Sequence, residues 1–316
     1  MRGREENLTK TYFPKSGTEA FLTARDGIKI RYGIFPAEKE TKATILLVNG
    51  HREFIEKYSE FIESLQARGY TVYAYDHRGQ GLSGRLLKNP LKSHNPDFGA
   101  LVRDMHQIVE EIIKPQLKAG PLYLIGHSLG GQICLRHLHD FPASFDKAIL
   151  LAPFLDLIIG PKPIAMMVKF YFKLLSFLGF SELFAPGQPR NRNMIDHDLT
   201  FSQLTHDRER YMWAEQAIDQ NPGLFIGGVT YGWLAGVIKS FKIIHSPGYT
   251  DAIKIPVLVL LAEQEFVVNN ETTLRIFKNA AHVEIETIAG TRHEMYREID
   301  PIRNRVLEKI VNFFSP

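Results

Sequence analysis

Short apolar runs alternate with amphipathic segments along most of this 316-residue chain, and this alternation limits the fold more than any other feature. Four of the runs contain no charged residue, and they occupy Thr44 to Val48, Thr71 to Tyr75, Leu122 to Ile125 and Ala148 to Leu151. Such continuous runs are typical of strands that are buried on both faces of a parallel sheet. The intervening segments have helical periodicity, and they cover Glu53 to Arg68, Phe98 to Leu117 and Leu129 to His139.

The same alternation returns towards the end of the chain, and a hairpin precedes it. The later elements are a strand over Pro256 to Leu261, a helix over about Glu271 to Asn279, a strand over His282 to Ile288 and a helix from about Pro301 to Phe314. Earlier, Asp26-Gly27 is a hairpin turn signal between the β-rich runs Glu19 to Thr23 and Ile28 to Phe35. The sequence therefore predicts an α/β fold, in which a mostly parallel sheet of about eight strands carries helices on both faces.

The alternation is interrupted between about residues 155 and 242. This stretch contains both tryptophans, Trp213 and Trp233, and many other aromatic residues, with proline and glycine pairs as breaks. We therefore expect residues 1–154 and 243–316 to form the α/β core. Residues 155–242 would form a helical insertion between two strands of that core.

Composition excludes several classes of protein. Lysines and arginines number 38 against 35 aspartates and glutamates, and the formal net charge of +3 is too small to indicate a nucleic acid partner. The single cysteine, Cys134, excludes an intramolecular disulfide and a cysteine-rich zinc site. The first ten residues include charges but no apolar run, so no secretory signal is expected. Because Lys169 and Lys173 interrupt the apolar segment Pro163 to Phe180, we expect a soluble, cytoplasmic protein.

One segment carries a chemical signature, the G-x-S-x-G pattern Gly126-His127-Ser128-Leu129-Gly130. It follows a predicted strand directly and precedes a predicted helix. A serine at such a sharp turn adopts a strained backbone conformation, and glycines two residues to either side avoid clashes. The N-terminus of the following helix favours developing negative charge. The pattern predicts a nucleophilic Ser128, and the alternative is a glycine-rich turn in which Ser128 caps the helix.

A serine hydroxyl is a weak nucleophile and needs a base, which in this arrangement follows the serine and an acid along the chain. His293 lies between the last predicted strand and the last predicted helix, so it would meet Ser128 at the C-terminal edge of the sheet. His245 and His282 fit less well, because neither follows a strand. The alternative for His293 is an ordinary histidine of a surface loop.

The acid that orients this histidine should follow the penultimate strand. The loop there contains Glu263 and Glu265 but no aspartate. We favour Glu265, because it lies further out in the turn and directly before apolar residues that would anchor the loop. A surface carboxylate is the alternative for Glu265, and Glu263 stays open as the acid.

Acyl transfer also needs two backbone N–H groups that stabilise the tetrahedral intermediate. The first would come from Leu129, directly after the serine. The second would come from His51, in the loop after the strand Thr44 to Val48, and its imidazole need play no catalytic part. Asn49 and Gly50 are also compatible with a plain turn at the end of a strand. This chemistry requires no metal and no organic cofactor.

With these residues in place, the chain resembles the serine α/β-hydrolases, and within them the monoacylglycerol lipase and bacterial lysophospholipase L2 group. The resemblance covers most of the chain and rests on residues 49–53 (NGHRE) with Lys57-Tyr58, 76–85 (DHRGQGLSGR), 126–131, 262–268 and His293-Glu294. It implies the α/β-hydrolase fold and a structural role for the glycine-rich segment 76–85. The chain departs from many relatives in two places, with Asn49 where they have histidine and Glu265 where they have aspartate.

Parts of the insertion also resemble the lid of that group, namely residues 204–207 (LTHD) with Arg210-Tyr211, and residues 227–231 (GGVTY). A lid offers apolar surface to an acyl chain, or it contacts a membrane interface with its lysines at the headgroups. The apolar segment Ile164 to Phe180 suits both uses, although a helix packed on the core is as compatible with it. The candidate pocket-lining residues are Phe154, Tyr171, Phe172, Trp213 and Trp233.

Together these features predict a serine-dependent carboxylic ester hydrolase that forms an acyl-enzyme. Its partner would be a small lipid ester with one acyl chain, either a lysophospholipid or a monoacylglycerol. One alternative is a serine aminopeptidase or an esterase of small esters on the same fold. Another is a non-catalytic protein that binds a ligand on a hydrolase fold. Oligomeric state, acyl-chain length and headgroup are not predicted.

Overall fold

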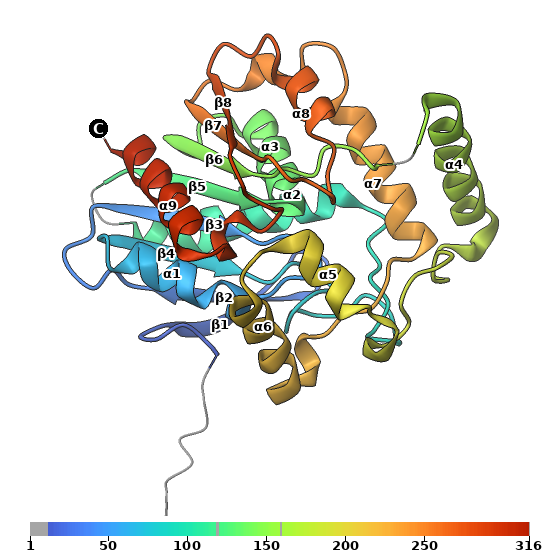
Figure 1. The fold of residues 1–316 in the computed structure, drawn as a ribbon, viewed down its shortest axis with the longest axis horizontal. Coiled ribbons are helices and arrows are strands. Elements are labelled where there is room, and N and C mark those ends of the chain that lie inside the picture. Colours follow the sequence, from blue (N-terminus) through green and yellow to red (C-terminus); the bar gives the residue numbers. More distant parts are fainter. Residues whose placement is uncertain (1–11, 118–119, 159, 316) are drawn as a thin grey trace, which may run out of the picture.

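The computed structural model of the protein describes residues 12–117, 120–158 and 160–315, so the charged segment 1–10 lies outside the described residues. Within the described part, eight strands form one sheet in the order β1-β2-β4-β3-β5-β6-β7-β8 (Figure 1). Their bounds are β1 Thr18–Thr23, β2 Lys29–Phe35, β3 Ala43–Val48, β4 Tyr70–Tyr75, β5 Leu122–His127, β6 Lys147–Leu151, β7 Val257–Ala262 and β8 Val283–Ile288. The neighbours from β4 to β8 pair in parallel, while β1 with β2 and β2 with β4 pair antiparallel. The predicted mostly parallel sheet is confirmed.

Helices cover both faces of this sheet, because the central strands alternate apolar side chains between the faces. The covering helices are α1 Ser59–Gln66, α2 Phe98–Ile108, α3 Leu129–Asp140, α7 Tyr231–Ile244, α8 Asn270–Phe277 and α9 Asp300–Phe314. On β3, the fully buried Ile45 and Leu47 belong to the apolar cluster that contains α1 and α9. The equally buried Leu46 and Val48 belong to the cluster that contains α2, α3 and α7. A continuous apolar run therefore marks a strand between two helix layers.

Two predicted helices are divided in the structure. The segment expected from Glu53 to Arg68 begins as a 3-10 turn over Ile55–Tyr58, and α1 follows it. The Ile55 backbone N–H donates to a carboxylate oxygen of Asp76 at 3.0 Å, so a contact outside the segment determines how it begins. The segment expected from Phe98 to Leu117 is α2, followed by a π turn over Val109–Ile113 and a 3-10 turn over Lys114–Gln116.

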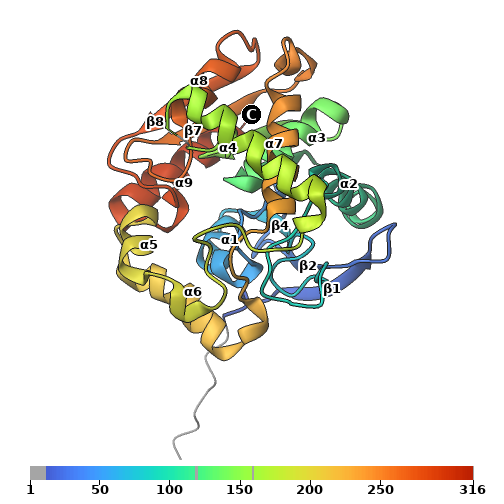
Figure 2. The ribbon, with the colours of Figure 1, turned by 90° about the vertical axis from the view of Figure 1, so that its right-hand side faces the viewer.

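Between β6 and β7 the described residues form four α-helices, and three of them lie outside the sheet layers. These three are α4 Lys162–Leu175, α5 His197–Leu204 and α6 Arg208–Gln220, which we call the insert helices. Figure 1 shows α4 at the right-hand edge, beside α7, and Figure 2 shows it lying across α7. The fourth helix, α7, packs within the same apolar cluster as α2 and α3. The division into a core and an insertion over 155–242 stays a prediction, and α7 within that range contacts the core.

The segment 204–211, which carries part of the family resemblance, attaches α5 and α6 to the loop after β8. The Leu204 carbonyl accepts a hydrogen bond from the Glu294 backbone N–H at 2.8 Å. The Thr205 hydroxyl donates to the Arg297 carbonyl at 2.7 Å. The Arg210 guanidinium forms ion pairs with Glu60 of α1 and with Asp300 at the start of α9. The insert helices are thereby connected to the loop that carries His293.

Candidate active site

Ser128 occupies a sharp turn between β5 and α3, with φ 51° and ψ −114°. A positive φ is strained for a residue that carries a Cβ atom, and it persists only where neighbouring contacts impose it. Here the Ser128 N–H donates to the Leu151 carbonyl of β6 at 2.9 Å, and the Ser128 carbonyl accepts from the Phe154 N–H at 2.9 Å. The neighbouring strand therefore supports the strained turn that the G-x-S-x-G pattern predicts.

The glycines of the pattern allow α3 to begin close to the sheet. A Cβ atom on Gly130 would lie 2.1 Å from the carbonyl oxygen of Val48, and one on Gly126 would lie 2.5 Å from Cys134 Sγ. The Val48 oxygen belongs to the backbone of β3, so it cannot move aside as a side chain can. The first N–H groups of α3, which begin at Leu129, have no acceptor within the helix and remain available at its N-terminus.

His293 follows β8 and forms a hydrogen bond with Glu265, which follows β7. The His293 Nδ1 atom lies 2.9 Å from Oε2 of Glu265, and both side chains are buried. The other Glu265 oxygen accepts the N–H groups of Val267 at 2.7 Å and Val268 at 3.1 Å. Burial raises the pKa of Glu265, but His293 and these hydrogen bonds outweigh it and hold that pKa below its usual range. Glu263 instead accepts the Gly290 N–H at 2.9 Å, so it is Glu265 that contacts the histidine.

Ser128, His293 and His51 line one cavity of about 340 Å³. Its apolar wall comes from the loops and helices between β6 and β7, and it includes Ile195, Leu204, Ile218, Leu224, Phe225 and Ile226. Arg52, Lys57, Glu215 and Arg297 contribute charged groups. Across the part of the chain that the structure describes, no group of three or more histidine, cysteine or acidic side chains is placed to hold a metal ion.

The loop after β3 brings His51 to this cavity. The His51 imidazole Nε2 lies 2.8 Å from the Ser93 hydroxyl, and its ring packs on Trp233 with the centroids 4.6 Å apart. Burial lowers the pKa of His51 to about 3, so the ring is neutral near pH 7 and serves packing. The next residue, Arg52, has a φ of 62°, and its N–H donates to the Gln80 side chain. The loop is therefore held from the neighbouring segment 76–85.

Segment 76–85 has further contacts that explain its sequence. The Arg78 guanidinium donates two hydrogen bonds, each 2.6 Å long, to the Asp104 carboxylate of α2. Asp76 forms a buried ion pair with Arg31, and a Cβ atom on Gly81 would lie 2.2 Å from the Asp76 side chain. These contacts give the segment the structural role that the resemblance implies.

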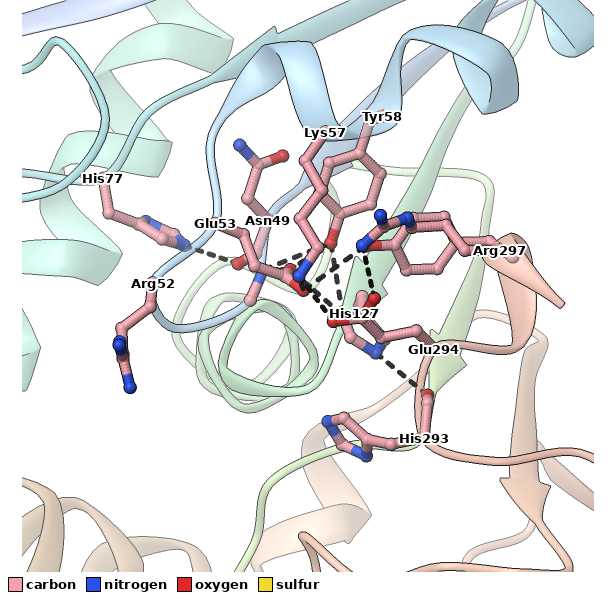
Figure 3. A network of polar contacts seen from close by, with 12 residues as sticks. Asn49, Arg52, Glu53, Lys57, Tyr58, His77, His127, His293, Glu294 and Arg297 are labelled. Atoms are coloured by element: carbon pink, nitrogen blue, oxygen red, sulfur yellow. Dashed lines mark hydrogen bonds and ion pairs between the residues drawn. The ribbon is translucent and has the colours of Figure 1, made fainter. Parts of the chain in front are cut away.

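A buried polar network connects the His51 loop with the His293 loop (Figure 3). Glu53 is its centre, since its Oε2 accepts the Gly50 N–H at 2.5 Å and its Oε1 accepts from Lys57 Nζ at 3.0 Å. Lys57 also forms an ion pair with Glu294, which Arg297 pairs at 2.6 Å. Burial raises the pKa of Glu53, but Lys57 and His127 outweigh it and hold that pKa well below its usual range.

His127 extends the network to the strained serine turn. Its Nδ1 lies 3.1 Å from Glu53, and its Nε2 lies 3.1 Å from the His293 carbonyl oxygen. Burial lowers the pKa of His127, but the Glu53 carboxylate outweighs it and raises that pKa above its usual value. His127 therefore joins the end of β5, directly before Ser128, to the loop of His293. Sequence reasoning missed this role, and its only signal was the place of His127 inside the G-x-S-x-G pattern.

The aromatic residues proposed from the sequence lie outside this cavity. Trp213 lines a separate cavity of about 660 Å³ beside α1 and α6, and its indole N–H donates to the Glu56 carbonyl at 3.2 Å. Trp233 supports the His51 ring, and Phe154 packs between Trp233 and Phe241. On α4, Tyr171 and Phe172 contact Tyr231. None of Phe154, Tyr171, Phe172, Trp213 and Trp233 lines the cavity of Ser128.

The fold is that of an α/β-hydrolase. It has a mostly parallel eight-stranded sheet, a serine at a sharp turn after β5, and a glutamate and a histidine in the loops after β7 and β8. Comparison with known protein families agrees with this architecture. The chain belongs to the family described as serine aminopeptidase S33, whose model matches residues 39–300.

Several characterised proteins are similar to most of the chain. It is 31% identical to lysophospholipase L2 of Escherichia coli, over 96% of this chain and 89% of that protein. It is 24% identical to a monoacylglycerol lipase of Mycolicibacterium smegmatis, over 91% and 93% of the two chains. A soluble variant of monoglyceride lipase from Saccharomyces cerevisiae, solved with a substrate analogue, has the same fold. Its TM-score is 0.72 at 18% identity, over 97% of this chain and 98% of that one.

Replacement of the buried cation of the network should destabilise the protein. In a Lys57→Met variant, Glu53 and Glu294 stay buried and close together without the ammonium between them, so we expect the free energy of unfolding to fall by about 3 kcal/mol. The matched control is Lys114→Met, which removes an exposed pair with Glu110 and should cost less than about 0.5 kcal/mol. Urea unfolding of both variants measures the difference, and equal losses would contradict the proposed importance of the network.

Proposed function

We propose that this protein is a serine hydrolase that cleaves the ester bond of a monoacyl lipid, with Ser128 as nucleophile, His293 as base and Glu265 as the acid. The observation that supports this most directly is the 2.9 Å contact between His293 and Glu265 at the wall of the cavity that also contains Ser128. A nucleophile, a base and an orienting carboxylate are the three parts that acyl transfer requires.

The reaction follows from the hydrogen bonds of these residues. Because Nδ1 of His293 donates to Glu265, Nε2 is the nitrogen that accepts the Ser128 proton as the hydroxyl attacks the ester carbonyl. The backbone N–H groups of His51 and Leu129 stabilise the oxyanion, and the ionised Glu265 stabilises the imidazolium. His293 then protonates the departing alcohol. Water finally hydrolyses the acyl-enzyme by the same proton transfers in reverse.

A substrate with one acyl chain agrees with the cavity and with the relatives. The volume of about 340 Å³ is near the lower end of the range for small-molecule sites, about 300–1,000 Å³, so one chain fits more readily than two. Its apolar wall suits an acyl chain, and the similar proteins named above are called lysophospholipase and monoacylglycerol lipase. An aminopeptidase would need a carboxylate for the substrate ammonium. The three carboxylates that line the cavity, Glu53, Glu215 and Glu294, are each already paired with a cation.

We also propose that the insert helices form a lid, and that α4 contacts the lipid surface from which substrate is taken. Among the described residues, one helical stretch, Pro163–Phe180, is long and apolar enough to cross a membrane, and none of it is buried. Its exposed apolar side chains include Met166, Met167, Phe170, Phe177, Leu178 and Phe180. An amphipathic helix of this kind binds at a membrane interface. Lys169 pairs with Asp156, and we assign Lys173, one helical turn further along α4, to the lipid headgroups. The expected cytoplasmic location stays a prediction.

Removal of the nucleophile tests the central proposal. Ser128→Ala keeps the same backbone strain, so the variant should fold while its ester hydrolysis falls by about 10⁴-fold or more. A fluorophosphonate probe should label the wild type and the exposed-serine control Ser246→Ala, but not Ser128→Ala. Unchanged hydrolysis by folded Ser128→Ala would refute the mechanism. A wild type that the probe does not label would favour a non-catalytic binding protein.

The two glutamates of the loop after β7 offer a matched pair of variants. Glu265→Gln removes the charge that stabilises the His293 imidazolium, so kcat should fall by about 10³-fold or more. Glu263→Gln alters only the contact with the Gly290 N–H and should leave kcat within about threefold of the wild type. Steady-state hydrolysis of a p-nitrophenyl ester measures both. The opposite ranking would assign the acid to Glu263.

The membrane contact is tested with exposed apolar residues on and off α4. Met167 is 72% exposed and Phe170 is 66% exposed, so a Met167→Ser and Phe170→Ser double variant should bind phospholipid vesicles at least about tenfold more weakly. Phe21→Ser is the control, because Phe21 is 52% exposed on β1. Vesicle sedimentation measures binding, and hydrolysis of a short soluble ester should stay unchanged. Equal vesicle binding by the double variant and the wild type would exclude α4 as the contact surface.

A further inference from the structure

The cavity of Ser128 contains a cation that the mechanism does not use. Three arginine or lysine side chains line this cavity, namely Arg52, Lys57 and Arg297. Lys57 and Arg297 are both paired with Glu294, and Lys57 is also paired with Glu53. Among the residues that the structure describes, no carboxylate lies within ion-pair distance of the Arg52 guanidinium. Figure 3 shows the Arg52 side chain pointing away from the buried network.

The position of Arg52 is imposed by the surrounding structure. Its φ of 62° is strained, and the Gln80 side chain holds its N–H. The carboxylate that acts on the Arg52 charge is Glu215, which also lines the cavity, but Arg192 binds that carboxylate at 2.8 Å. Burial lowers the pKa of Arg52, and a guanidinium keeps its proton in proteins. A half-buried, unpaired guanidinium is costly, so its presence in a substrate cavity indicates an anionic ligand.

We propose that Arg52 binds the headgroup phosphate of a lysophospholipid and so makes this enzyme select lysophospholipids over monoacylglycerols, an assignment that rests on the proposed ester hydrolase function. A guanidinium binds phosphate oxygens with two parallel hydrogen bonds, a geometry that suits no neutral hydroxyl as well. In a lysophospholipid, the phosphate and the scissile ester are attached to the same glycerol, only a few covalent bonds apart. Arg52 correspondingly adjoins His51, whose N–H faces the ester oxygen in the proposed mechanism. A monoacylglycerol would place only a hydroxyl beside Arg52 and would leave the cation unpaired.

The experiment compares two substrates with the same decanoyl chain, lysophosphatidylglycerol and monoacylglycerol, both below their micelle concentrations. For Arg52→Ala, we expect kcat/KM on the lysophospholipid to fall about tenfold to a hundredfold, because a charge-assisted hydrogen-bonded pair is lost. On the monoacylglycerol it should change by less than about threefold. Arg52→Lys, which keeps the charge but not the fork, should recover part of the loss. Arg208→Ala, which removes an exposed guanidinium on α6, is the control and should leave the ratio of the two values unchanged.

Each other outcome is distinct. Equal losses of Arg52→Ala on both substrates would overturn the proposal and leave Arg52 as a support of the His51 loop. Inorganic phosphate is also tested as an inhibitor of monoacylglycerol hydrolysis. Phosphate could inhibit the wild type while Arg52→Ala leaves the ratio of kcat/KM on the two lipids unchanged. In that case the guanidinium binds a free anion, and the headgroup assignment is wrong. A wild type that hydrolyses neither lipid would instead refute the proposed function itself.

Discussion

The buried carboxylate of Glu53 is the group on which the rest of the site depends. It accepts hydrogen bonds from the Gly50 N–H, from Lys57 and from His127, and these residues belong to or contact the loops after β3, β5 and β8. Each loop follows a different strand, and the pairing of parallel strands does not by itself determine how these loops lie relative to one another. A buried charge is costly unless it is fully paired, so the network is stable only when all its members are in place. The same interaction that stabilises the fold therefore positions the loops that carry the proposed catalytic residues.

Two residues of this site, Ser128 and Arg52, have a strained backbone with positive φ, and contacts with neighbouring segments hold each of them. Ser128 has a positive φ because its N–H donates to Leu151 of β6 and its carbonyl accepts from the Phe154 N–H just after β6. Arg52 has one because its N–H donates to the Gln80 side chain. Gln80 belongs to segment 76–85, whose Arg78 is fixed by Asp104 of α2. The glycine-rich segment thus connects a core helix to the loop of His51 and Arg52, which lines the same cavity as Ser128. The glycines of this segment indicate only that backbones approach closely. Its contacts through Arg78 and Gln80 show that it also supports the loop of Arg52.

The sequence predicts the sheet well, because burial on both faces requires continuous apolar runs, as on β3. It also indicates the loops that carry Ser128, His293 and Glu265; the last two are in contact and the first two line one cavity, while their catalytic roles stay a prediction. It does not predict the cavity wall. Large aromatic side chains are conspicuous in a sequence, yet Trp233 packs on the His51 ring, while the wall consists of medium-sized residues such as Leu204 and Ile226. Those residues come together through long-range contacts of the insert helices, which have no local periodicity to reveal them.

The charge of the cavity separates the activities that this family's fold could support. Within the described part of the chain, its carboxylates are paired with cations, so a substrate ammonium would find no free anion, whereas the Arg52 guanidinium has no ion-pair partner there. Electrostatics in a half-buried site is stronger than in water, so this single imbalance favours a substrate that carries negative charge close to its ester. The apolar wall suits an acyl chain on the same substrate. A lysophospholipid combines both features in one small molecule, and the fold, the network and the unpaired arginine are each consistent with its cleavage.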